Sequence, residues 1–202
     1  METHTIARVK FPVIILAAGL SARMGHSKAF LKWDKHATFL EKIIKEYSDF
    51  ASGQVIVVLN QDGYQQLLTE NLAVEDYCKI IINPHPERGR LSSLKLGVSE
   101  LTKKTACYVQ NVDNPFVSAD LLDAMNNLVE NDAYVVPVFE GKGGHPVLLG
   151  ASIIDSVAEI QEDDAALHLI LQKFKRIELE TKDAQILVNI NTQEDYKNYF
   201  HH

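Results

Sequence analysis

The sequence predicts an α/β fold of βαβ units around a mostly parallel sheet. Short apolar runs rich in β-branched residues, which suit buried strands, alternate along the chain with segments of helical period. The first of these runs, 13–16, leads directly into a loop of small residues. Open α/β sheets place their ligands at that point, beyond the carboxyl end of a strand. At 202 residues the chain can form one domain, 1–202, with a substantial core.

The other elements are expected in alternating order. Further strands are predicted at 54–60, 79–83, 106–112 and 134–139. Helices are predicted at 38–50, 62–71, 92–101 and 118–129, the last with Ser118 as its N-cap. A flexible turn and a short extended return give a small hairpin at about 139–150. The chain is then expected to form helices at 152–160 and 163–174, strands at 176–179 and 186–190, and a final helix from Thr192.

Composition excludes several classes of partner. The formal net charge of -7 argues against a nucleic-acid partner, which usually needs a basic face. The two cysteines form neither a disulfide framework nor a CxxC site, so a reducing cytoplasm is the expected setting. No apolar run reaches the length of a membrane span, and the polar start lacks the apolar core of a signal peptide. Small molecules are therefore the expected partners.

The loop after the first strand carries the most informative chemistry. Ala17, Ala18 and Gly19 are small enough to let backbone N–H groups approach an anion closely. Arg23 and Lys28 add two cations to the same loop. Small residues beside two cations are typical of a polyphosphate site. A plain connection between a strand and a helix is the alternative.

Two better-known phosphate loops do not fit this stretch. The P-loop spacing fails because five residues separate Gly19 from Gly25 and His26 follows. The dinucleotide fingerprint fails because Ser21 stands where its second glycine belongs. From Leu16 to Lys28 the chain instead resembles the signature L-A-A-G-x-S-x-R-M-G-x-x-K of the nucleotidyltransferases, specifically the molybdenum-cofactor cytidylyl- and guanylyltransferase-like family.

This resemblance extends from about Phe11 to Asp195 and carries clear expectations. It implies a Rossmann-like three-layer α/β/α sandwich of the nucleotide-diphospho-sugar-transferase type. It also implies transfer of a nucleoside monophosphate from a nucleoside triphosphate to a phosphorylated acceptor, with release of pyrophosphate. The residues that it places on the nucleotide are Leu16, Ala17, Ala18, Gly19, Arg23 and Lys28.

Asp113 is the candidate metal ligand. It lies in the stretch Asn111-Val112-Asp113-Asn114-Pro115, at the exit of the predicted strand 106–112. Mg²⁺ prefers one or two carboxylates together with substrate phosphates, and a turn residue is the alternative. The resemblance identifies Asp113 as the family's metal-binding aspartate, holding Mg²⁺ or Mn²⁺ and acting in catalysis with Arg23 and Lys28. Val112 and Asn114 depart from the residues usual on either side of it.

A third stretch pairs Arg90 with Ser93. Serine hydroxyls and backbone N–H groups that open a helix suit an anion or a base edge. In related cytidylyltransferases an arginine three residues before a serine helps to hold the nucleotide, and Arg90 and Ser93 have that spacing. A plain N-cap and a solvated loop are the alternatives.

Two later positions complete the candidate site. Gly143-Gly144-His145-Pro146-Val147 resembles an element that lines the acceptor side in the cytidylyl branch, so His145 is a candidate partner of an acceptor phosphate or a residue that only fixes the turn. Asn191 belongs to a stretch that resembles the family's closing motif, which reaches metal and substrate. Asn189 and Asn191 replace aspartates there, which removes two potential negative charges. Capping of the last helix explains the stretch equally well.

The sequence is mixed on the choice of base. The A-A-G and G-H-P stretches favour CTP, whereas the asparagine form of the closing motif is commoner in the guanylyl branch. The resemblance implies molybdopterin as acceptor, and a molybdoenzyme or its maturation chaperone as a candidate protein partner. A sugar- or polyol-phosphate would use the same loop and metal. A non-catalytic nucleotide-binding regulator is the alternative of another class.

Overall fold

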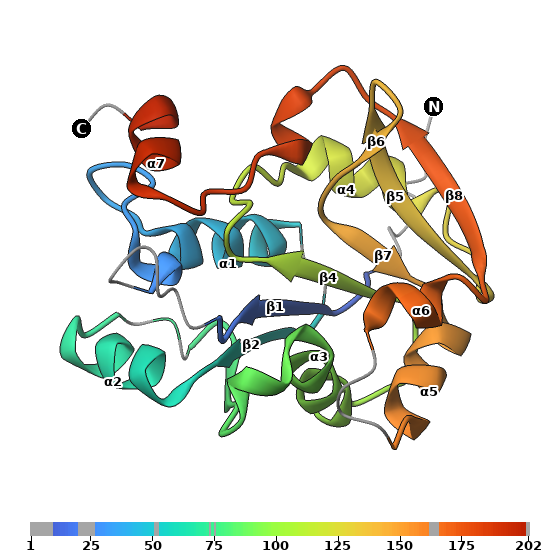
Figure 1. Ribbon diagram of the computed structural model, residues 1–202, viewed down its shortest axis with the longest axis horizontal. Coiled ribbons are helices and arrows are strands. Elements are labelled where there is room, and N and C mark those ends of the chain that lie inside the picture. Colours follow the sequence, from blue (N-terminus) through green and yellow to red (C-terminus); the bar gives the residue numbers. More distant parts are fainter. Residues whose placement is uncertain are drawn as a thin grey trace, which may run out of the picture.

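The computed structural model describes residues 10–19, 27–50, 53–72, 74, 76–161 and 166–200. Its centre is an eight-stranded sheet with helices on both faces, so the predicted α/β sandwich is confirmed (Figure 1). The strands run in the order β3-β2-β1-β4-β7-β5-β6, and β8 pairs with β5. Their bounds are β1 (Val13–Ala17), β2 (Val55–Leu59), β3 (Lys79–Ile82), β4 (Cys107–Asn111), β5 (Ala133–Phe139), β6 (Lys142–Gly143), β7 (Val147–Leu149) and β8 (Lys175–Glu180).

The first four strands form a parallel half. β1 lies between β2 and β4, with Leu16 opposite Val58 on one side and Asn111 on the other. The strands β1, β2 and β4 are almost wholly buried, which explains why β1 and β2 are continuous apolar runs rather than alternating ones. Successive side chains of β1 point to opposite faces, so that Val13 and Ile15 enter one core and Ile14 enters the other.

The helices fall on the two faces that the strand pattern predicts. In Figure 1, α1 (Phe39–Asp49), α4 (Ala119–Asn126) and α7 (Gln193–Tyr199) lie on one side of the sheet. The helices α3 (Arg90–Ser99) and α5 (Ala151–Glu159) lie on the other, and α2 (Gln61–Thr69) and α6 (Leu167–Leu171) flank the two ends. The N-caps of α1, α4 and α7 are Thr38, Ser118 and Thr192, and each side chain accepts a hydrogen bond from a backbone N–H in the first turn.

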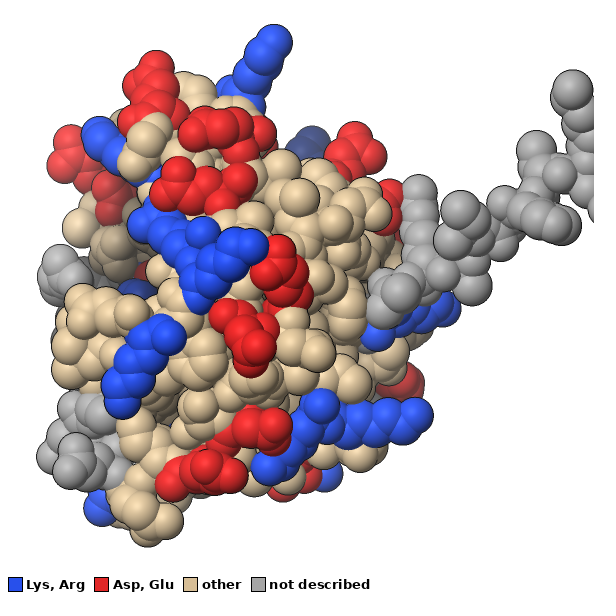
Figure 2. Space-filling model, turned by 90° about the vertical axis from the view of Figure 1, so that its right-hand side faces the viewer, with Lys and Arg blue, Asp and Glu red and all other residues tan. Residues whose placement is uncertain are grey.

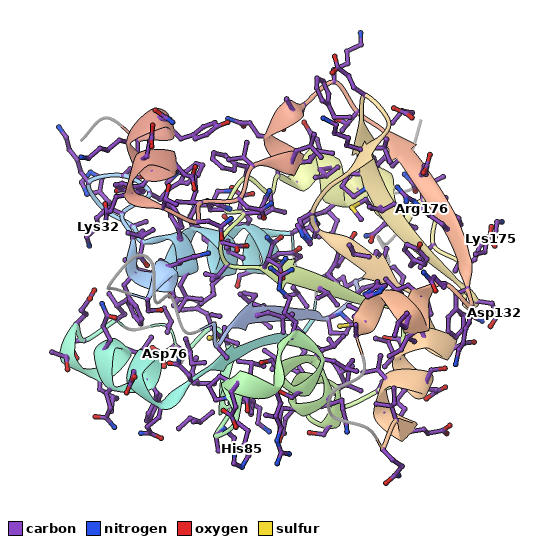
Figure 3. The ribbon with its side chains drawn as sticks, viewed as in Figure 1. Lys32, Asp76, His85, Asp132, Lys175 and Arg176 are labelled. Atoms are coloured by element: carbon purple, nitrogen blue, oxygen red, sulfur yellow. The ribbon has the colours of Figure 1, made fainter. Side chains whose placement is uncertain are left out.

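The second half of the sheet is mixed. β7, the extended return predicted near 145–149, enters the sheet antiparallel between β4 and β5. β8 runs parallel to β5 and carries charged side chains, of which Lys175 pairs with Glu130 and Arg176 with Glu178. Figure 2 shows positive and negative side chains side by side on the face that contains β8, and Figure 3 labels Lys175 and Arg176 there. Charges of this kind oppose pairing of an edge strand with another chain.

Three predicted boundaries are wrong in an instructive way. Residues 186–190 are not a strand: the 3₁₀ turn η3 (Ala184–Leu187) occupies the start of that stretch, and its backbone groups bond to loops rather than to a neighbouring strand. Of the helix predicted at 163–174, the described residues form only α6, which ends at Leu171; residues 162–165 lie outside the described residues. The helix predicted to begin at Ser92 begins two residues earlier, at Arg90.

Two smaller features complete the fold. Trp33 packs edge to face against Phe39, Phe116 and Phe200 and so belongs to an apolar cluster. Among the described residues, none of the helices combines the length and the apolar character that a membrane span requires.

Candidate active site

The candidate site is a pocket at the carboxyl ends of β1 and β4. From β1 the chain first builds outward through β2 and β3 and then returns to β1's other side as β4, so these two strands form a topological switch point. Such points leave a crevice beyond the strand ends, where α/β proteins bind ligands. The pocket has a volume of about 390 Å³. It is lined by Leu16, Ala18, Gly19, Lys28, Pro86, Gly89, Arg90, Ser93, Asn111, Val112, Asp113 and Asn191.

Lys28 connects two distant parts of this pocket. It begins the 3₁₀ turn η1 (Lys28–Phe30), whose Ala29 and Phe30 are buried, so the base of the side chain is anchored in the core. Its Nζ lies 3.2 Å from Oδ2 of Asp113 and 2.5 Å from Oδ1 of Asn191. The Lys28 side chain is 16% exposed and that of Asp113 is 11% exposed. An ammonium group so placed can neutralise an anion that enters the pocket.

Asp113 has an oxygen that the protein does not use. Oδ2 receives Lys28, whereas Oδ1 is buried and has no hydrogen-bond partner among the described residues. A buried carboxylate oxygen without a partner is costly unless a ligand satisfies it. A divalent cation with phosphate and water ligands would do so, and the amide oxygen of Asn191, which shares the ammonium of Lys28 with Asp113, is a further oxygen in the same pocket. The donor set therefore fits Mg²⁺ or Mn²⁺ shared with substrate phosphates.

The first turn of α3 forms one wall. Gly89, before the helix, has φ of +86°, a conformation that favours glycine. Asn83, at the end of β3, is buried, and its Nδ2 donates to Oγ of Ser92 at 3.1 Å and of Ser93 at 2.9 Å. This amide therefore fixes the serine that lines the pocket beside Arg90.

The exit of β1 forms the adjoining wall. Asn60, the N-cap of α2, donates from Nδ2 to the carbonyl oxygen of Ala18 at 3.2 Å and so holds the strand exit in place. A Cβ built on Gly19 would meet none of the described residues within 4 Å. Ala17 points into the core instead of the pocket.

His145 lies just outside the pocket lining. Its Nε2 is 2.9 Å from Nδ2 of Asn111, a donor, so the neutral ring carries its proton on Nδ1. Burial lowers the pKa of His145 below its ordinary value, while the nearby carboxylate of Asp113 opposes and Arg90 assists that shift. Nδ1 is buried without a partner among the described residues, so His145 also offers an unused donor.

The backbone of Asn191 is held by the capping box at the start of α7. The backbone N–H groups of Asn191 and Thr192 donate to Oδ2 of Asp195 at 2.9 and 2.8 Å. These hydrogen bonds, with the bond to the Thr192 side chain, lower the pKa of Asp195. The predicted capping function of this stretch is confirmed, and it places the Asn191 side chain in the pocket at the same time.

The structure thus brings most of the predicted site residues to one place. Ala17 and His145 lie beside the pocket rather than in its lining, and Arg23 lies outside the described residues. Sequence reasoning assigned no role to Asn60, Asn83 and Asn111. Their shared signal is a buried amide at the end of a strand, where a polar side chain needs a specific partner. The residues of the lining that were predicted are Leu16, Ala18, Gly19, Lys28, Arg90, Ser93, Asp113 and Asn191.

Comparisons with known proteins agree with this geometry. Residues 13–177 match the model of the MobA-like NTP transferase domain. The chain is 30% identical over 184 residues to the molybdenum cofactor cytidylyltransferase of Escherichia coli K12, covering 91% of this chain and 92% of that protein. It is 29% identical over 194 residues to a probable molybdenum cofactor guanylyltransferase of Bacillus mycoides, covering 91% and 92%.

Solved structures share the fold. A nucleotidyl transferase from Methanothermobacter superposes with a TM-score of 0.76 at 18% identity, over 94% of this chain and 95% of that one. A Mycobacterium tuberculosis protein in complex with manganese superposes with a TM-score of 0.76 at 17% identity, over 95% and 98%. The sheet is therefore of the nucleotide-diphospho-sugar-transferase type that the sequence predicts.

Proposed function

The chain belongs to the MobA-like NTP transferase domain family, and from that premise we propose that it transfers CMP from CTP to the phosphate group of molybdopterin, with GMP from GTP as the second possibility. One observation carries the proposal. The cation Lys28, the carboxylate Asp113 and the amide Asn191 converge in a pocket at the switch point of the sheet. The A-A-G and G-H-P stretches support CTP as the first choice, while the cytidylyl- and guanylyltransferase relatives match equal shares of the chain.

The proposed reaction balances without a general base. An oxygen of the acceptor phosphate attacks the α-phosphorus of the triphosphate, a new P–O bond forms, and the bond to the bridging oxygen breaks to release pyrophosphate. That acceptor oxygen is already nucleophilic, so the protein has to position the reactants and neutralise charge.

The residues of the pocket divide this work. Lys28 lies where its ammonium can leave Asp113 and Asn191 to meet the triphosphate, and Arg90 and Ser93 approach the nucleotide from the first turn of α3. The backbone from Leu16 to Gly19 gives the nucleotide an open surface, and Arg23 is proposed to add a second cation. Positioned cations in a partly buried site stabilise charge that develops in the transition state.

The acceptor side is proposed to lie at His145 and Asn111. The unused Nδ1 donor of His145 is suited to an acceptor phosphate or another anionic group. Asp113 and the phosphates would hold Mg²⁺ or Mn²⁺, which supplies Lewis-acid stabilisation of phosphate charge when bound. The protein with manganese among the structural relatives supports testing both metals.

The test combines binding and turnover. The melting temperature of the purified protein is measured with CTP, GTP, ATP or UTP, each with and without Mg²⁺. In a separate assay, pyrophosphate release is measured with molybdopterin as acceptor. Selective binding should raise stability by about 2.7 kcal/mol at a hundredfold excess over the dissociation constant. The proposal requires stabilisation by CTP or GTP and pyrophosphate release that depends on molybdopterin.

Other outcomes separate the alternatives. Turnover with a sugar- or polyol-phosphate but not with molybdopterin would replace the proposed acceptor. Stabilisation by a nucleotide without turnover over a broad panel of acceptors would indicate a nucleotide-binding regulator. If the molybdopterin dinucleotide is formed, a molybdoenzyme or its maturation chaperone is the expected recipient.

A further inference from the structure

The residue after the candidate metal ligand makes an unusual set of contacts. Asn114 is 1% exposed and does not line the pocket. Its Nδ2 lies 3.2, 3.0 and 2.7 Å from the carbonyl oxygens of Gln185, Ile186 and Val188. One side-chain amide thus donates to three carbonyl oxygens of the segment 185–190, which lies more than seventy positions later in the chain.

Asn114 is itself rigidly held. Its backbone N–H donates to the carbonyl oxygen of Asn111 at 3.2 Å, and its carbonyl oxygen accepts from Nε2 of Gln110 at 2.7 Å. Gln110 is fully buried in β4 and is also bonded to the hydroxyl of Tyr47. The amide that meets the segment 185–190 is therefore part of the sheet's own scaffold.

The same segment is confined from its other side. The carbonyl oxygen of Ile186 also accepts from the backbone N–H of His145 at 3.0 Å. Gly144 lies so close that a Cβ there would be 2.4 Å from this oxygen. The backbone N–H of Ile190 donates to the carbonyl oxygen of Asp113 at 2.8 Å. The segment is thus clamped between the exit of β4 and the turn before β7.

The clamp ends one residue before Asn191. In Figure 1 the red trace that leads into α7 passes near the end of β4, where the Ile190–Asp113 hydrogen bond joins the two. Asn191 then places Oδ1 at 2.5 Å from Nζ of Lys28. We propose that Asn114 is a positioning residue: its amide holds the segment 185–190 against β4 and so sets Asn191 against Lys28. This inference rests on the proposed function for its effect on turnover.

The chemistry of an amide explains the choice of asparagine. Two N–H donors without charge suit a cluster of carbonyl oxygens, and the oxygen Oδ1 is left buried without a partner among the described residues. An aspartate of the same shape would offer only acceptors to the same carbonyls. Asn114→Asp therefore removes the clamp with almost no change of volume. Asn114→Ser, which keeps one donor, serves as a milder variant if the first folds poorly.

The first readout requires no substrate. Backbone hydrogen exchange is measured in the wild type, in Asn114→Asp and in Asn126→Asp, a control in α4 that keeps its acceptor for the hydroxyl of Tyr108. Exchange within 184–191 should accelerate by at least about tenfold in Asn114→Asp and stay unchanged in the control. Unchanged exchange there in both Asn114 variants overturns the clamp, whether or not the wild type turns over.

The second readout is a double-mutant cycle on nucleotidyl transfer. Asn114→Asp should lower kcat by about ten- to a hundredfold, while KM for the triphosphate changes little. If Asn114 acts through Asn191, its effect should nearly disappear in an Asn191→Ala background and persist in an Arg90→Ala background. Effects that multiply fully in both backgrounds would show a merely structural residue and overturn the proposal. A wild type without transfer activity would instead refute the proposed function, and the exchange experiment would still decide the clamp.

Discussion

The two sides of the pocket are built in different ways. The side formed by the exits of β1 and β3 is held by amides with shorter-range partners: Asn83 bonds to Ser92 and Ser93, nine and ten positions away, and Asn60 bonds to Ala18 across 42 positions. The side beyond β4 depends on partners far apart in the chain. Asn114 meets Ile186 across 72 positions, and Lys28 meets Asn191 across 163.

The two sides also contribute different groups to the pocket. The β1 side contributes small residues, and backbone N–H groups among small residues can bind any phosphate group. The β4 side contributes the carboxylate, the imidazole and two amides whose mutual distances decide what they can bind. We therefore expect substitutions on the β4 side to alter geometry and turnover, and those on the β1 side to alter nucleotide affinity.

The largest effect is expected where the two sides meet. Lys28→Met and Asp113→Asn should each lower kcat about a hundredfold or more, because both remove preorganised charge from the pocket. Pyrophosphate release under saturating triphosphate measures the effect. Lys45→Met is the matched control, since that lysine is 78% exposed on α1 and pairs only on the surface with Asp49. A decrease of less than about tenfold in both variants would contradict the assignment.

A pair of glycine variants sharpens the comparison through stability. Gly144→Ala should lower the free energy of unfolding by about 1–3 kcal/mol, because its Cβ would lie 2.4 Å from a backbone oxygen that cannot easily move. Gly19→Ala should leave stability within about 0.5 kcal/mol of the wild type, because that Cβ has no neighbour within 4 Å. Urea unfolding compares the two. Equal losses would show that the two sides are packed alike.

The smallest effect concerns pH. Burial lowers the pKa of His145 in the folded protein below the value of 6.5 that it has in the unfolded chain. The unfolded chain therefore binds a proton at a higher pH than the folded protein does. Stability should therefore be complete above pH 6.5 and decrease as the pH falls below it, since the unfolded state then binds more protons. Melting temperatures between about pH 7.5 and 5.5 record the loss, and His145→Gln should show a flatter profile. An equally steep profile in the variant would assign the dependence to another group.

The same division explains what could be predicted from sequence. The strands β1 to β4 and the loop motif followed from local pattern, because buried apolar runs and caps such as Thr38 depend on neighbouring residues. The stretch 186–190 has the same apolar pattern but is not a strand, since the amide of Asn114 takes its carbonyl groups. Asn114 was noted only as a departure from the family pattern. Its partners lie too far along the chain for any local pattern to reveal.

The contact between Lys28 and Asn191 also has a consequence for synthesis of the chain. Chains emerge from the ribosome amino end first, and domains can begin to fold as they emerge. The four parallel strands are complete by Asn111, whereas the partner of Lys28 follows 163 positions after it. A nascent or truncated chain can therefore contain Lys28 and Asp113 before Asn191, the third residue of the cluster, has been synthesised. Completion of the pocket therefore waits for a residue that is synthesised long after the four parallel strands.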